Sequence, residues 1–120
     1  MDDATTIGEL KKRAEAFVAA RDWEQFHTPK NLAMALAGEA AEVMEHFQWA
    51  TCESSKRIAS EEPTRSQVAE ELADCFMYLM HFSNRTGIDL SEAVLAKMKG
   101  NEERYPVGKC KGSAKKYNQL

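Results

Sequence analysis

Two pairs of acidic residues with matching spacing are the groups in this chain best suited to bind a metal ion. Glu39 and Glu42 form the first pair, and Glu71 and Asp74 form the second. Residues three apart on a helix are neighbours on one side of it. If each pair lies on a helix and the two helices pack together, four carboxylates come close to one another. Such a cluster repels itself unless the acids face water or a cation lies between them.

The ligand chemistry narrows the choice of metal. Ligation by oxygen alone favours a hard cation, Mg²⁺ or Mn²⁺, over zinc. A di-iron bundle uses Glu-x-x-His on two helices, and neither His46 nor His81 has a glutamate three residues before it. The alternative is that the acids only belong to solvated helix faces. Two acidic pairs with the same spacing on consecutive predicted helices favour a metal site. The predicted metal ligands, which are also the predicted catalytic residues, are Glu39, Glu42, Glu71 and Asp74.

Local signals place these residues on helices. The capping-box spacing, a side-chain oxygen three residues before Glu or Gln, occurs at Thr6, Thr64 and Asp89, and Thr28-Pro29 marks a further start. The predicted helices span 6–20, 28–49, 64–86 and 89–104. Between them lie an aromatic loop at 21–27, a polar link at 51–63 and a tight break at Gly87. No segment alternates like a strand, so we expect an all-α four-helix bundle.

Helical periodicity predicts that the acids border the core. The apolar stripes are Leu32, Leu36, Val43 and Phe47 in the second helix and Val68, Leu72, Phe76 and Leu79 in the third. At about 100° per residue, Glu39 falls within about 20° of the edge of its stripe. Glu71, Asp74 and Tyr78 group on one flank of the third helix. Each acidic pair therefore projects beside apolar side chains.

Length and composition predict one domain. The chain has 120 residues, of which 43% are hydrophobic, and we expect a helical domain at 1–104 followed by a basic tail at 105–120. No apolar run approaches the roughly 18 residues of a membrane helix. The three cysteines are odd in number and lack CxxC spacing, which is typical of reduced thiols. The expected location is cytoplasmic, with no membrane partner.

Charge is unevenly distributed. Residues 1–96 carry nine basic and 17 acidic side chains, whereas residues 97–120 carry seven basic and two acidic ones. The acidic part makes a nucleic-acid polymer a poor partner, because a phosphate backbone needs a broad basic face. In the fourth predicted helix, Lys97, Asn101 and Arg104 share one side, which suits a phosphate chain. One alternative is that Lys97 and Arg104 only stabilise the C-terminal end of their helix. For the basic residues that follow, the alternative is a solvated tail without a binding role.

Five segments of the chain together match the pattern of one known family. They are Arg21-Asp22-Trp23-Glu24-Gln25-Phe26-His27, Gly38-Glu39 with Glu42, Phe47-Gln48-Trp49, Glu70-Glu71-Leu72 with Asp74, and Arg104-Tyr105-Pro106. With these segments the chain resembles the dCTP pyrophosphatase branch of the all-α, MazG-like nucleoside triphosphate pyrophosphohydrolases, and the resemblance covers about residues 8–118. The paired acids are the signature of the superfamily, whereas the 21–27 segment is specific to this branch.

The resemblance implies a Mg²⁺-dependent hydrolase that converts dCTP, or a modified dCTP, to dCMP and pyrophosphate and so cleans the nucleotide pool. It implies Mg²⁺ ligation by the four acids and assembly as a homodimer or homotetramer. From the chemistry of the acids alone, we expect Glu39 or Glu42 to accept the proton of the attacking water. The implied substrate-binding residues are Trp23, Glu24, Gln25, Phe26, His27, Trp49, Tyr78, Lys97, Asn101, Arg104 and Tyr105.

Two alternatives stay open at this point. Ala14 stands where relatives in this branch can carry a histidine that shapes the pocket, so the same chemistry on dUTP or on a broad set of nucleoside triphosphates remains an alternative. The second alternative is a non-catalytic helical interaction module that keeps the fold and an acidic surface. Loss of activity on removal of one acid separates either enzyme from the module, and relative rates on dCTP and dUTP separate the two enzymes.

Overall fold

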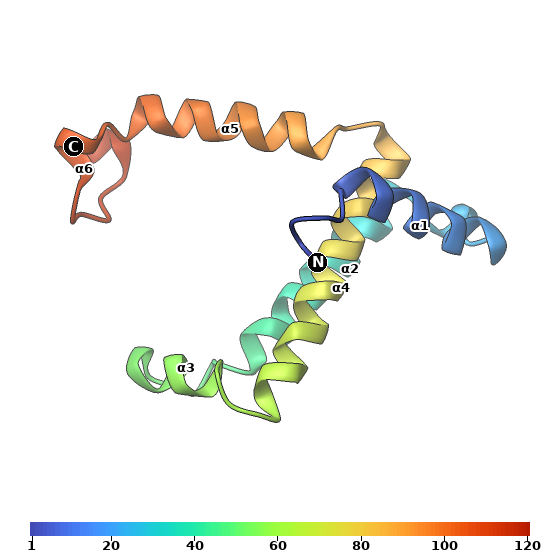
Figure 1. Ribbon diagram of the computed structural model, residues 1–120, viewed down its shortest axis with the longest axis horizontal. Coiled ribbons are helices and arrows are strands. Elements are labelled where there is room, and N and C mark those ends of the chain that lie inside the picture. Colours follow the sequence, from blue (N-terminus) through green and yellow to red (C-terminus); the bar gives the residue numbers. More distant parts are fainter. The chain divides into compact units, whose positions relative to one another are not determined.

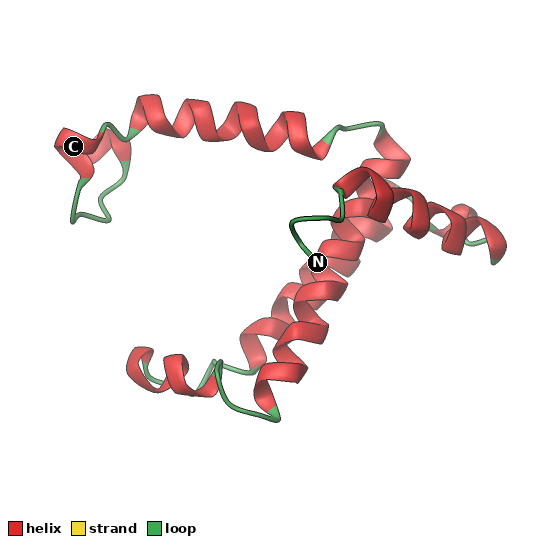
Figure 2. Ribbon diagram, viewed as in Figure 1, coloured by secondary structure: helices red, strands yellow, loops and turns green.

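The computed structural model describes residues 1–120 and contains helices and loops but no strand (Figures 1 and 2). The α-helices are α1 (Ile7–Ala20), α2 (Pro29–Glu45), α3 (Cys52–Ile58), α4 (Thr64–Thr86), α5 (Leu90–Arg104) and α6 (Val107–Cys110). Two 3₁₀ turns, η1 and η2, span Glu24–Phe26 and Tyr117–Gln119. The all-α prediction is confirmed, with six helices in place of four. None of them is long and apolar enough to cross a membrane.

The chain divides into two compact units, residues 1–88 and residues 89–120. The first contains α1 to α4, and the second contains α5, α6 and η2. The predicted division into a domain at 1–104 and a tail at 105–120 stays a prediction.

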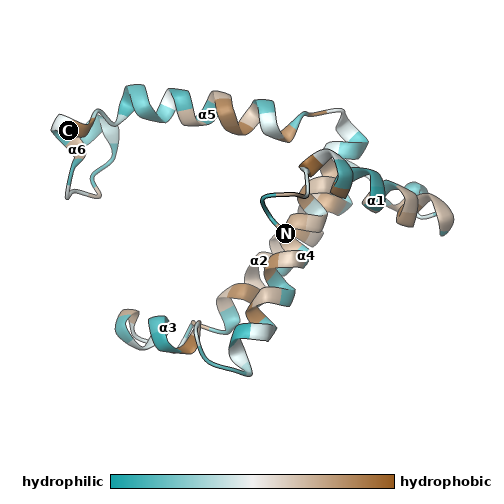
Figure 3. Ribbon diagram, in the orientation of Figure 1, coloured by the Kyte–Doolittle hydropathy of each residue, from teal (hydrophilic) through white to brown (hydrophobic).

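The first unit is organised around two long antiparallel helices. Figure 1 shows α2 and α4 side by side, with the short α3 at the end where the chain turns back. Helix α1 packs on α4. Figure 3 shows that apolar residues are frequent along α2 and α4 and scarce along α3. The most deeply buried apolar side chains come from all three long helices of this unit and are Ala14, Val18, Leu32 and Met80.

Three predicted helix ends are confirmed by hydrogen bonds. The Thr6 hydroxyl accepts from the Glu9 amide while the Glu9 carboxylate accepts from the Thr6 amide, so the capping box is complete. The Thr28 side chain caps α2, with proline as its first residue. Helix α4 ends at Gly87, whose φ of 73° is the left-handed conformation that glycine adopts most easily.

The predicted helix at 28–49 is four residues too long. Helix α2 ends at Glu45, and the amides of His46 and Phe47 bond to carbonyls three residues back, at Val43 and Met44. These tighter bonds turn the chain out of the helix. The turn gives Trp49 a position with 91% of its surface exposed.

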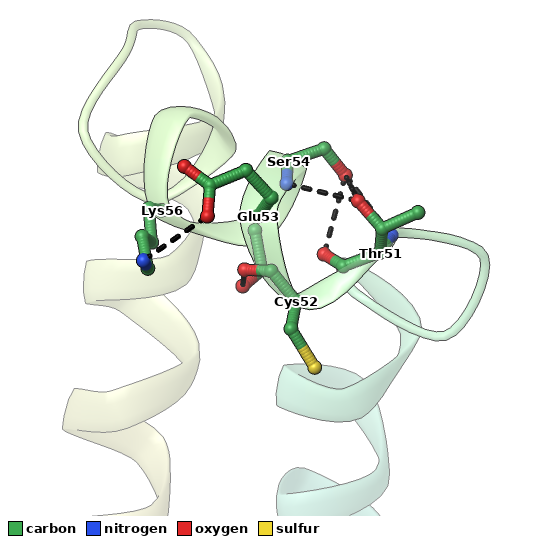
Figure 4. Close-up of polar contacts among 6 residues, drawn as sticks. Thr51, Cys52, Glu53, Ser54 and Lys56 are labelled. Atoms are coloured by element: carbon green, nitrogen blue, oxygen red, sulfur yellow. Dashed lines mark hydrogen bonds and ion pairs between the residues drawn. The ribbon is translucent and has the colours of Figure 1, made fainter.

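The segment at 51–63 is not only a polar link, because it contains α3. Figure 4 shows the start of this helix, where Thr51 and Ser54 each accept a hydrogen bond from the other's backbone amide. Serine replaces the glutamate of the usual capping box, so a search for Glu or Gln at that position does not find it. An ion pair of 3.1 Å between Lys56 and Glu53 adds a contact one turn apart.

The predicted capping box at Thr64 is wrong. Thr64 is the first residue of α4, and Pro63 occupies the cap position without a side-chain hydrogen bond. The carboxylate of Glu62 instead accepts from the Ser66 amide at 3.2 Å. A carboxylate in front of a helix N-terminus serves the same free amides that a threonine cap would serve.

The predicted apolar stripe of the third helix is also partly wrong. Leu72 is 55% exposed and Leu79 is 39% exposed, whereas Met80 and His81 are buried. The inner face of α4 therefore does not follow the predicted stripe, and it includes the flank that carries Glu71, Asp74 and Tyr78.

The second unit contains no fully buried side chain in its helices. Asp89 caps α5 by accepting from the Glu92 amide at 2.8 Å, as predicted. At the other end of α5, the Arg104 guanidinium lies 5.2 Å from the centre of the Tyr117 ring, and Tyr105 meets the same ring edge-on at 6.2 Å. These contacts fold the C-terminal segment back on the end of α5.

Candidate active site

Three of the four predicted acidic residues come together between α2 and α4. One carboxylate oxygen from each of Glu39, Glu42 and Glu71 lies within 4.8 Å of the others. Glu39 and Glu42 occupy adjacent turns of α2, and Glu71 comes from the antiparallel α4. The packing of α2 against α4 brings these residues to the same height along the two helices. The sequence therefore builds an acidic cluster at the contact that organises the first unit.

Asp74 lies at the edge of this cluster. It is not among the three acids whose oxygens meet, but its negative charge raises the pKa of both Glu39 and Glu71. It also lines the same pocket as Glu39. The structure thus places the four predicted acids in one region, with Asp74 on the side that faces the pocket.

The electrostatics of the cluster favour a bound proton or a cation. Burial raises the pKa of Glu39, and hydrogen bonding with Glu42 and the charges of the neighbouring acids raise it further. Hydrogen bonding with Glu42 is the main cause of the raised pKa of Glu71, with burial second, while His46 acts in the opposite direction. The His46 Nε2 atom lies 3.8 Å from the Glu71 carboxylate. Like charges this close at low dielectric disfavour full ionisation.

The geometry fits a small divalent cation. Glu39 Oε2 is buried and has no hydrogen-bond partner, which is rare for a buried oxygen and indicates a missing positive partner. Opposite ligands of Mg²⁺ are about 4.2 Å apart, given bonds of about 2.1 Å. The three carboxylate oxygens all lie within 4.8 Å of one another, which is within reach of one such ion after small side-chain adjustments. The donor set is entirely oxygen, as a hard cation prefers.

A pocket of about 170 Å³ borders the acidic cluster. Its walls combine the two acids already described with aromatic, imidazole and thioether side chains from α1, the 21–27 loop and α4. The lining residues are Phe17, Trp23, His27, Glu39, Asp74, Met77, Tyr78 and His81. An apolar pocket with a few polar groups is the usual form of a small-molecule site. The pocket therefore offers flat apolar walls directly beside the group of acids.

The 21–27 loop is fixed by its own hydrogen bonds. The Gln25 amide donates to the backbone and side-chain oxygens of Asp22, at 3.0 and 3.2 Å. The Asn31 amide donates to the Phe26 carbonyl at 3.0 Å, which ties the loop to α2. Trp23 then meets Phe17 edge-on, with ring centres 5.6 Å apart. Gln25 thus holds the loop that presents Trp23 and His27 to the pocket.

The predicted substrate-binding residues divide into three groups. Trp23, His27 and Tyr78 line the pocket. Glu24, Gln25, Phe26 and Trp49 do not line it, and Phe26 and Trp49 are 59% and 91% exposed. The third group lies on α5 and just after it, in the second unit, and consists of Lys97, Asn101, Arg104 and Tyr105. The role of these residues in substrate binding stays a prediction.

Four residues of this region were not among the sequence predictions. His46, which contacts Glu71, lies four residues after Glu42, and His81 lies three residues after Tyr78. Both spacings continue the acidic face of their helix and are signals that could have found them. Phe17 and Met77 line the pocket only because α1 packs on α4, and no local spacing signals that.

Arg85 connects the loop to the helices beneath it. Its side chain is only 21% exposed, and its guanidinium pairs with Glu15 of α1 and lies 3.8 Å from Glu24 of the loop. The hydrogen bond to Glu15 is the main reason that the pKa of Arg85 is raised. One side chain at the end of α4 thus holds both α1 and the segment that carries Trp23.

Replacement of Arg85 by methionine is expected to lower the free energy of unfolding by about 1.5–3 kcal/mol, the usual range for a hydrogen bond to a charged partner. Arg57→Met is the matched control, because the Arg57–Glu61 pair is more than half exposed on both sides and such pairs contribute about 0–1 kcal/mol. Urea unfolding followed by circular dichroism measures both. Equal losses in the two variants would show that the Arg85 contacts do not hold α1 and the loop.

Comparison with known proteins defines the class to which this fold and site belong. The model of the MazG-like family matches residues 35–120, and the chain belongs to this family. It is 44% identical to dCTP pyrophosphatase 1 of Bos taurus and 40% identical to that of Homo sapiens, each over 96% of this chain and 68% of the relative. The fold is similar to that of a pyrophosphatase from Archaeoglobus fulgidus, with a TM-score of 0.78 and 36% identity over 83% of this chain and 92% of that one.

Proposed function

We propose that this protein hydrolyses dCTP to dCMP and pyrophosphate. The observation that carries the proposal is a single one: Glu39 belongs both to the acidic cluster and to the wall of the aromatic pocket. A nucleotide with its base in that pocket has its phosphates within reach of the cluster. Mammalian relatives at 40–44% identity are dCTP pyrophosphatases, and they support this substrate over other nucleoside triphosphates.

The acids are proposed to hold Mg²⁺, with Mn²⁺ as a substitute. Glu39, Glu42 and Glu71 would supply carboxylate oxygens, and Asp74 would complete the set from the pocket side. When bound, the metal neutralises charge that develops on the phosphates and makes a nearby water more acidic. The unpaired Oε2 of Glu39 supports this assignment.

The remaining roles in the reaction are proposed for side chains of the protein itself. Trp23 and Tyr78 offer ring faces to the base and fix the nucleoside end of the substrate. The proposed proton acceptor for the attacking water is Glu39, because of the two candidate bases Glu39 and Glu42 it alone lines the pocket. A positioned carboxylate at that point takes the proton as the bond between the α- and β-phosphates breaks. The products are the monophosphate and pyrophosphate.

Assembly as a homodimer or homotetramer is part of the proposal. Large apolar side chains stay exposed on the two central helices, with Met34 at 65%, Met44 at 57% and Leu72 at 55%. A second copy of the chain that covers them would remove apolar surface from water. Size-exclusion chromatography with light scattering measures the assembly.

The proposed setting is the cytoplasm, where the enzyme would remove excess or modified deoxycytidine triphosphate. All three cysteines are free, which is typical of a reducing compartment. Burial, reinforced by Glu39 and Asp74, raises the pKa of the Cys75 thiol. This thiol beside the acidic cluster therefore stays protonated and unreactive.

Incubation of the purified protein with dCTP and Mg²⁺ tests the proposal directly. We expect dCMP and pyrophosphate in equal amounts by chromatography and phosphorus NMR, and no product when the metal is chelated. Release of dCDP and orthophosphate would contradict cleavage at the α–β bond. Intact dCTP beside rapid cleavage of dUTP would contradict the base assignment while leaving the reaction class in place.

A further inference from the structure

His81 is a buried histidine in the wall of the pocket. It lies on α4 one turn after Tyr78 and two turns after Asp74, and only 7% of its surface is exposed. Its ring centre is 4.8 Å from that of His27 in an edge-on arrangement and 5.9 Å from that of Tyr78. Because His81 and His27 both line the pocket, two imidazoles from different elements meet at one place in its wall.

The histidine pair holds unused hydrogen-bonding capacity. His27 Nδ1 is buried and has no hydrogen-bond partner. Buried polar atoms in folded proteins nearly always have one, so an unpaired nitrogen in a pocket wall indicates a partner that enters with the ligand. The neighbouring wall residues Phe17 and Met77 offer no strong donor or acceptor. The histidines, with the Tyr78 hydroxyl and the Trp23 indole N–H, are therefore the uncharged groups of this pocket that can recognise a polar edge.

The surroundings keep His81 neutral. Burial is the main cause that lowers the pKa of His81, and the neighbouring His27 and Arg85 lower it further. Glu15 raises this pKa, but its influence is smaller than that of burial. At neutral pH a neutral imidazole presents one N–H donor and one acceptor nitrogen. Along one edge, cytosine carries a carbonyl oxygen and a ring nitrogen that accept hydrogen bonds and an amino group that donates, which matches the donor and acceptor of the imidazole.

We propose that His81, together with His27, hydrogen-bonds the polar edge of the pyrimidine base and thereby determines base specificity in this pocket. The proposal rests on the proposed function, because it assumes that the pocket takes the base of a deoxynucleotide. His81 acts on the base and not on the phosphates. Its replacement is expected to weaken binding of ligands that carry a base and to leave pyrophosphate binding unchanged.

Calorimetric titration with dCMP and, separately, with pyrophosphate in the presence of Mg²⁺ tests this without any need for turnover. For His81→Phe, which keeps a ring of similar size, we expect the Kd for dCMP to rise about five- to tenfold, as the loss of one hydrogen bond implies, and the Kd for pyrophosphate to stay the same. His81→Leu should give the same split. His81→Gln, which restores a donor and an acceptor, should recover part of the dCMP affinity.

Ser83→Ala is the matched control for a purely structural defect. Ser83 is buried on the same helix and donates a hydrogen bond to the Ile88 carbonyl, but it does not line the pocket. This variant should lose stability and keep both affinities. Unchanged dCMP affinity in both apolar variants, or an equal loss for dCMP and pyrophosphate, would overturn the role of His81. Failure of the unmodified protein to hydrolyse dCTP while it binds dCMP would instead overturn the proposed function alone.

Discussion

Replacement of Glu39 by glutamine is expected to reduce the rate of dCTP hydrolysis by a factor on the order of 10³, since a catalytic metal supplies several kcal/mol of transition-state stabilisation. Glutamine keeps the size of the side chain but removes the charge that would hold the cation. Glu39 is also the acid that joins the cluster to the pocket. Steady-state kinetics over a range of Mg²⁺ concentrations measures the loss.

Glu53→Gln is the matched control, because it removes the same charge from a residue of α3 whose side chain is 87% exposed. This variant should retain the parental rate. An E39Q protein that hydrolyses dCTP as fast as the parent would contradict the proposed metal site. Equal inactivation of both variants would point to net charge and not to a metal ligand.

The same substitution has a second readout that does not depend on activity. The pKa values of Glu39 and Glu71 are raised in the folded protein, chiefly by burial and by hydrogen bonding with Glu42 respectively. The folded state therefore binds protons more tightly than the unfolded chain. The metal-free protein loses stability as the pH rises above about 4.5, the ordinary value for glutamate. Added Mg²⁺ should raise Tm at pH 7 and much less at pH 5.

Glu39→Gln removes one of the repelling charges. The metal-free variant should have a Tm at pH 7 equal to or above that of the parent, and it should no longer gain stability from Mg²⁺. Differential scanning fluorimetry with and without a chelator measures both effects. A full Mg²⁺ response in E39Q would place the cation elsewhere.

The helix boundaries that could be predicted are those set by residues close together in the chain. Thr6 with Glu9, Thr28 before Pro29, and Gly87 each determine a helix end through contacts within a few residues. The end of α2 and the start of α4 could not be read in this way. At both places other groups, the carbonyls of the last turn and the Glu62 carboxylate, take the hydrogen bonds.

The packing of α4 shows why apolar periodicity alone was misleading. The stripe that contains Leu72 and Leu79 is well defined in sequence, yet these two residues are 55% and 39% exposed. The side of α4 with Glu71, Asp74 and Tyr78 meets its neighbours instead. In a small chain, a helix can carry apolar residues on two faces, of which only one packs against other helices of the same chain. The apolar periodicity does not say which face that is.

The candidate site was predictable in its acids and only partly in its pocket. The spacing of the acids within α2 and α4 does not depend on where the helix ends lie, and Glu39, Glu42 and Glu71 meet as the pattern predicts. The pocket depends on how α1 and the 21–27 loop lie against α4. Phe17 and His81 are more than 60 residues apart in the chain, and no local pattern joins them.

Replacement of Trp23 by alanine is expected to raise KM for dCTP by about 5- to 50-fold with a much smaller change in kcat. Stacking of a base on an aromatic side chain is worth about 1–3 kcal/mol, and Trp23 is the largest ring in the pocket wall. The acids that would bind the metal come from α2 and α4 and do not depend on this loop residue. Initial rates over a range of dCTP concentrations separate the two constants.

The control for Trp23 is its conservative variant. Trp23→Phe keeps a flat apolar face and should restore most of the affinity, because every aromatic ring can stack on a base. Since Trp23 is 43% exposed and follows the end of α1, helical circular dichroism should be the same in all three proteins. An unchanged KM in Trp23→Ala would exclude stacking at this residue. A loss of helical signal would show instead that its edge-on contact with Phe17 is needed to hold α1 in place.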